Sequence, residues 1–78
     1  MEFIVDLNKV EDVKKFVKYA ERYDVDIIVR NRERAFAVDG SSIMAMFSLD
    51  LSQPVIVDIK DNEAAESFKQ DISKFIYC

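Results

Sequence analysis

Two serine hydroxyls before a predicted short helix are the first groups in this chain that could take part in chemistry. Ser41 and Ser42 stand directly before an apolar run that ends at Leu49. A serine here caps the first helical turn, which is worth about 1 kcal/mol. A phosphate on the same hydroxyl would meet free backbone N–H groups and the positive end of the helix dipole. Ser42 is therefore expected to be a helix cap, a role that Ser41 could also fill, at a position that could accommodate a phosphate.

Other groups with catalytic potential are scarce. The chain has no histidine, one cysteine (Cys78) and one glycine (Gly40), so a zinc ligand set and a glycine-rich phosphate loop are both missing. An Asp-x-Asp-x-Asp loop for calcium is missing too. The carboxylates of Glu63, Glu66 and Asp71 flank an amphipathic helix and are not expected to converge. We expect no metal, no cofactor and no enzymatic activity.

The short helix after Ser42 carries more apolar side chains than one buried side can use. Residues 43, 46 and 47 share one side at helical spacing, and Met44 points elsewhere. A two-layer domain covers only one side of such a helix. Methionine is flexible and polarisable, which suits a protein-binding surface. Two roles stay open, a place in the core and a partner-binding surface made of Ile43, Met44, Met46 and Phe47.

Composition and charge exclude several functions. Seventy-eight residues, half of them hydrophobic, suffice for a single domain over residues 1–78 but leave little room for an enclosed substrate pocket. A net charge of −4 argues against nucleic acid as a partner. No apolar run reaches the roughly 18 residues of a membrane span, and no targeting peptide is evident. The lone Cys78 favours a reducing cytoplasm.

Three arginines form the one local basic cluster. Arg30, Arg32 and Arg34 surround Glu33 in a predicted hairpin connection. A phosphate or nucleic-acid contact is one reading. A solvated hairpin fits the acidic composition better, because no exposed aromatic side chains alternate with the arginines.

Alternating and helical apolar patterns predict the elements that position these groups. Period-two alternation predicts strands over residues 2–7, 25–30, 35–38 and 55–60, with Pro54 able to begin the last of them. Helical spacing predicts a first helix from about Lys9 to Arg22, with Asn8 and Glu11 as a capping box. A last helix begins at Asp61 or Asn62. Its apolar side is expected to consist of Ala65, Phe68, Ile72, Phe75 and Ile76.

The order β-α-β-β-α-β-α predicts an α+β fold, a two-layer open-faced sandwich in which helices cover one side of a four-stranded sheet. The element order and chain length resemble those of HPr, the histidine-containing phosphocarrier protein of the bacterial sugar phosphotransferase system. Residues 42–49 (SIMAMFSL) are similar to the family's serine followed by Ile-Leu/Met-Gly-Val-Met-Ser-Leu, and residues 23–27 and 55–59 resemble two of its strand segments. The resemblance implies an antiparallel sheet of order 1-4-2-3 with all helices on one face.

The phosphocarrier site of the family is degenerate in this chain. The family carries Gly-Leu-His-x-Arg-Pro-Ala at the entry to its first helix. Here Lys9 falls at the phosphorylated histidine, Glu11 at the arginine that steadies the phosphate and Asp12 at the proline. Phosphoryl carriage requires an imidazole that titrates near neutral pH, whereas a lysine ammonium is protonated there. Glu11 and Asp12 would also repel a phosphate. We expect the carrier reaction to be absent.

The resemblance favours a regulatory, protein-binding module in a bacterial cytoplasm. The family docks its partners through positions that match Ile43, Met44 and Phe47, and a dedicated kinase phosphorylates the serine that matches Ser42 in some bacteria. The lysine that usually precedes this serine is Ser41 here. The alternative is a structural domain that forms homodimers through the same apolar patch or through the edge of the third strand.

Overall fold

The strands pair into one antiparallel sheet, as the resemblance to HPr implies. The computed structural model describes residues 1–33 and 36–76. The strands are β1 (Glu2–Val5), β2 (Ile28–Asn31), β3 (Ala37–Asp39) and β4 (Val55–Asp58), in the order β1-β4-β2-β3. The predicted fold class and strand order are confirmed. The short β3 is an edge strand.

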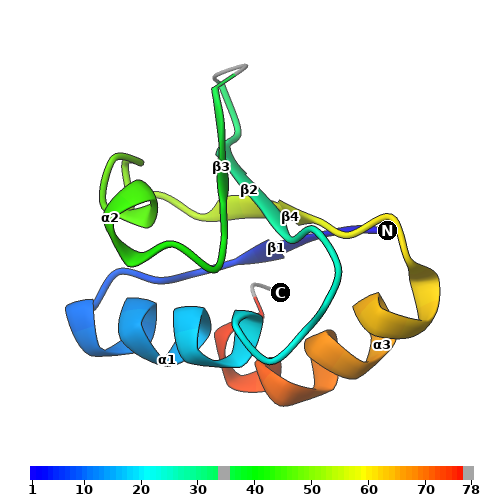
Figure 1. Cartoon of the computed structure of the whole chain (residues 1–78). Helices are drawn as coiled ribbons and strands as arrows, with labels where there is room; N and C mark the ends of the chain where they lie inside the picture. The colour runs from blue at the N-terminus through cyan, green and yellow to red at the C-terminus, as the bar shows by residue number, and fades with distance from the viewer. Residues whose placement is uncertain (34–35, 77–78) are drawn as a thin grey trace.

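Helices cover one side of this sheet. Figure 1 shows α1 (Val10–Ala20) and α3 (Asn62–Asp71) beneath it, while α2 (Ile43–Met46) packs against α1 and β3 at one end. The inward side chains of the strands and the apolar sides of all three helices form a single core. Phe16 of α1 and Phe68 of α3 meet edge to face, with ring centroids 5.3 Å apart. Burial of these apolar side chains is the main force that holds the two layers together.

The first helix begins differently from the prediction. Its N-cap is Lys9, whose side chain makes no capping hydrogen bond, and the backbone N–H groups of Asp12 and Val13 donate to the Lys9 carbonyl. Because Lys9 has an extended backbone, Asn8 lies one residue outside the cap. The predicted capping box of Asn8 and Glu11 is therefore wrong. The helix ends at Ala20, two residues before Arg22.

The other boundaries shift by a few residues. The second strand begins at Ile28 instead of residue 25. Just before it, the Ile27 carbonyl accepts from the Gly40 N–H at 2.7 Å, which continues the β2–β3 register by one residue. Asp61 caps α3 by accepting from the Ala64 N–H at 3.0 Å. The helix ends at Asp71 and is followed by a 3-10 turn, η1 (Ser73–Phe75). Predictions that involve Arg34, Ala35 and Cys78 concern residues outside the described ranges.

The described parts of the chain contain no candidate membrane-spanning helix. None of the helices there combines the length and apolarity that crossing a bilayer requires.

Candidate functional site

A tight turn places Ser42 at the start of α2. The Ser41 backbone N–H and hydroxyl both donate to Asp39 Oδ1, at 2.9 and 2.7 Å. Gly40 packs against the second strand so closely that a Cβ would lie 3.0 Å from Ile27 Cγ2 and 3.1 Å from Val29 Cγ2. Ser42 is the N-cap, and its Oγ accepts from the Ala45 N–H at 3.3 Å. The choice left open between the two serines therefore falls on Ser42.

The apolar side chains of α2 divide between water and the core. Met44 is 84% exposed and Phe47 is 46% exposed, whereas Ile43 is half-buried against the core. Met46 is completely buried, so it cannot contact a partner in this fold. The prediction of Met46 as a partner-binding residue is therefore wrong, because its side of the short helix faces α1 and the sheet.

An apolar residue that the sequence analysis missed joins this surface. Val10, the first residue of α1, is 56% exposed, although its helical spacing suggested a buried position. Figure 1 shows that α1 begins at the same end of the molecule as α2. We call Val10, Ile43, Met44 and Phe47 the docking surface.

The residues that the resemblance places at the family's carrier site lie at the start of α1. Lys9 and Glu11 are exposed, and Asp12 is half-buried in the first turn. Lys9 thus lacks the burial that can turn a lysine amine into a nucleophile. The two carboxylates lie where backbone N–H groups and the helix dipole favour negative charge. The site can stabilise the helix, but an incoming phosphate would meet two negative side chains.

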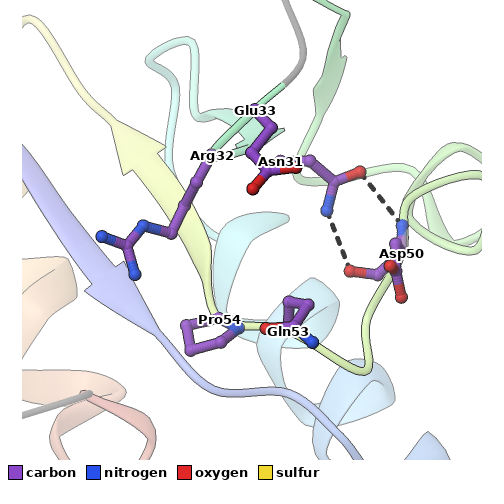
Figure 2. Close-up of a pocket in the computed structure, with 6 residues that line it drawn as sticks. All are labelled: Asn31, Arg32, Glu33, Asp50, Gln53 and Pro54. Carbon is purple, nitrogen blue, oxygen red and sulfur yellow. Dashed lines mark hydrogen bonds between the residues drawn. The ribbon is translucent and has the colours of Figure 1, made fainter.

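A polar hollow of about 710 Å³ lies between the β2–β3 connection and the segment before β4. Figure 2 shows its lining by Asn31, Arg32, Glu33, Asp50, Gln53 and Pro54. Asn31 is the buried polar residue of the described chain. Its Nδ2 donates to the Asp50 carbonyl at 2.8 Å, and its Oδ1 accepts from the Asp50 N–H at 3.1 Å. This pair ties β2 to the loop that follows α2.

Replacing Asn31 should therefore loosen the loop. Asn31→Ala removes both hydrogen bonds between the Asn31 side chain and the Asp50 backbone, and we expect a loss of about 1–3 kcal/mol in the free energy of unfolding. Gln53 is exposed in the same hollow, and the free energy of unfolding of Gln53→Ala should lie within about 0.5 kcal/mol of the parent value. Urea unfolding of both variants checks the difference. Equal stability of the two would show that the Asn31 pair does not hold the loop.

Two of the three arginines in the predicted hairpin, Arg30 and Arg32, lie among the described residues. Arg30 lies on the solvent side of the sheet, 3.5 Å from Glu2 Oε2. Arg32 lines the polar hollow, and in Figure 2 its guanidinium points away from the Asn31–Asp50 pair. Arg30 thus has a carboxylate partner, and Arg34 lies outside the described residues.

Tyr23 links the loop after α1 to α3. Its hydroxyl donates to Asp71 Oδ2 at 2.6 Å and lies 2.9 Å from Ser67 Oγ, and its ring meets Phe68 edge to face. Burial raises the pKa of the Tyr23 hydroxyl, and the hydrogen bond to Asp71 raises it further. Asp71 thus has a structural partner, while Glu63 and Glu66 are exposed on the same helix.

This link predicts a loss of stability at alkaline pH. Because the folded pKa lies above the ordinary value of 10.0, the contribution of Tyr23 is complete below pH 10 and is lost as the pH rises through the folded pKa. Tyr23→Phe should lose about 1 kcal/mol at pH 7 and show a smaller decline above pH 10. Chemical unfolding of both proteins between pH 7 and 11 measures this. A parallel decline in both would refute the assignment.

The described residues contain no metal-binding cluster. No group of three Asp, Glu, Cys or His side chains there lies close enough together to hold an ion.

Comparison with known families identifies the chain's relatives. Residues 12–77 match the sequence model of the family described as "PTS HPr component phosphorylation site". The match begins at Asp12, so it covers α2 and Ser42 and leaves out Lys9 and Glu11. No curated protein matches the chain.

Proposed function

We propose, from the premise that this chain belongs to the HPr family of the phosphotransferase system, that it is a non-catalytic regulatory module that binds protein partners. The observation that carries the proposal is the exposure of Met44 and Phe47, at 84% and 46%, on a helix of only four residues. Large apolar side chains gathered in water typically mark a protein interaction site. The sequence supplies the second half of the argument, since no histidine is present to carry a phosphoryl group.

In this proposal, the docking surface functions without phosphoryl transfer. Lys9, Glu11 and Asp12 take the place of the carrier machinery, and partners in a bacterial cytoplasm recognise α2 and the start of α1. Partner recovery tests the proposal: the tagged chain should retain a specific protein from an extract of its own source. Recovery that does not depend on Met44 or Phe47 would refute it.

Ser42 is the proposed site of regulation. Its hydroxyl accepts a hydrogen bond from Ala45 N–H at 3.3 Å at the start of α2, next to Ile43 and Met44. A phosphate there would change the charge of the docking surface without requiring a new backbone conformation. Intact-mass and fragment-mass spectrometry of natively expressed protein should find phosphate on Ser42. Phosphate on Ser41 or Ser48 instead would contradict the assignment.

The alternative function is self-association through the same docking surface or through β3. The observation in its favour is that β3 is a three-residue edge strand with one unpaired side. Sedimentation at several concentrations separates the two proposals. A strict monomer at high concentration excludes self-association, whereas a dimer lost in Met44→Asp would assign the surface to a second copy.

A further inference from the structure

The solvent side of the sheet is more apolar than the solvated face of an antiparallel sheet usually is. Strand register places eight side chains outward, and we call them the outer face. They are Glu2, Ile4, Ile28, Arg30, Ala37, Asp39, Ile56 and Asp58. Antiparallel sheets with one solvated side usually present polar residues there. Half of the outer face is apolar, so its composition differs from that pattern.

The apolar side chains of the outer face form a contiguous group. Each of the four-residue strands, β1, β2 and β4, points one isoleucine outward. Ile4 and Ile56 are directly opposite each other across β1 and β4. Ile28 lies diagonally from Ile56 on the neighbouring strand and is 36% exposed. Directly opposite and diagonal neighbours on one sheet face are close enough to make contact, so the three isoleucines form one patch.

Carboxylates border this patch on one side. Glu2, Asp58 and Asp39 fall in the same transverse row as Ile28. Glu2 and Asp58 are directly opposite each other, an arrangement of like charges that destabilises a sheet. Arg30 is the one cation among the eight outward positions, and it lies 3.5 Å from Glu2 Oε2. The outer face thus combines an apolar centre with an excess of two negative charges.

These features point to one kind of occupant. We propose that the outer face is a second interaction surface, separate from the docking surface, for an amphipathic helix that carries lysine or arginine beside its apolar stripe. The apolar stripe would cover Ile4, Ile28 and Ile56, and the cations would face Asp58 and Asp39, the two carboxylates of the row that do not pair with Arg30. The inner side of the same sheet already packs against helices α1 and α3, so its twist suits a helical layer. The charges favour a basic helix and oppose both an acidic one and a second copy of this net-negative chain.

Two synthetic helical peptides with the same leucine stripe test the charge preference. One carries lysines on its polar flanks and the other carries glutamates at the same positions. The peptides are titrated into the isotope-labelled full chain and followed by NMR. The lysine peptide should shift the amide signals of Ile4, Ile28 and Ile56, and the shifts should reach saturation. The glutamate peptide should bind at least 10-fold more weakly. Equal binding of both peptides, or shifts confined to Met44 and Phe47, would overturn the proposal.

Matched substitutions localise the binding. Ile56→Lys adds a cation at the centre of the outer face and should weaken the lysine peptide at least 10-fold. Phe36→Lys adds the same charge at an exposed apolar position in the β2–β3 connection, outside both surfaces, and should leave binding unchanged. Ile28→Lys, nearer the rim, serves if Ile56→Lys does not fold. Parent-like binding by the folded outer-face variants would refute the proposal. Concentration-dependent shifts at these isoleucines without peptide would refute it as well, because they would identify a second copy as the occupant.

Discussion

Substituting aspartate for Met44 and Phe47 is expected to weaken binding of the recovered partner at least 10-fold while the fold persists. The two side chains are the most exposed apolar groups of the docking surface besides Val10. Aromatic and flexible apolar side chains that become buried on binding carry most of the affinity in such interfaces, and a carboxylate in their place would lose its hydration. Titration calorimetry with the purified partner measures the change.

A matched control separates docking from general surface hydrophobicity. Phe36 lies in the β2–β3 connection outside the docking surface and is 55% exposed, close to the value for Phe47. Phe36→Asp should bind the partner with an affinity within about twofold of the parent's. The free energy of unfolding of Met44→Asp, measured by thermal unfolding, should lie within about 0.5 kcal/mol of the parent value, because exposed positions tolerate substitution. If Phe36→Asp weakened the partner as much as Phe47→Asp, the docking surface would be wrongly located.

Local patterns were sufficient to predict the architecture. Alternation located all four strands, and the single-sided apolar pattern of Phe16, Phe68 and their neighbours predicted a two-layer arrangement. Boundaries were less accurate. The start of α1, for example, depends on the backbone of Lys9 and not on the capping side chain of Asn8.

The exposure of the proposed docking residues was predicted only in part, for a geometric reason. Helical spacing groups residues on one side of a helix, but it does not show where the neighbouring elements end. Met46 is covered by the core, whereas Phe47, the next residue, is half exposed. Val10 follows the same spacing as the buried residues of α1 and still lies in water, because it begins the helix at the end of the molecule. Asn31 could not be predicted because its partner is a backbone unit 19 residues away.

Loss of the phosphoryl acceptor is the second large effect that we expect. A carrier in this family needs a nucleophilic nitrogen at the start of the first helix, with positive groups to hold the phosphate. The chain presents an exposed lysine N-cap followed by Glu11 and Asp12 at that place. A protonated ammonium has no lone pair for attack on phosphorus, and the two carboxylates oppose the approach of the anion.

A gain-of-function variant provides the control for this expectation. Lys9→His combined with Glu11→Arg and Asp12→Pro restores the residue types of the family. The proline removes the 3.0 Å hydrogen bond from the Asp12 N–H to the Lys9 carbonyl but no bond deeper in the helix. We expect this variant to accept phosphate from enzyme I. Acceptance would show that enzyme I recognises the fold and that the side chains at residues 9, 11 and 12 make the difference.

Incubation of the unmodified chain with enzyme I and labelled phosphoenolpyruvate tests the central claim most directly, with an active HPr as the positive control. We predict that the active HPr acquires acid-labile phosphate and that this chain acquires none. Acid-labile phosphate on the unmodified chain would contradict the account, because it would show that phosphoryl carriage survives without histidine.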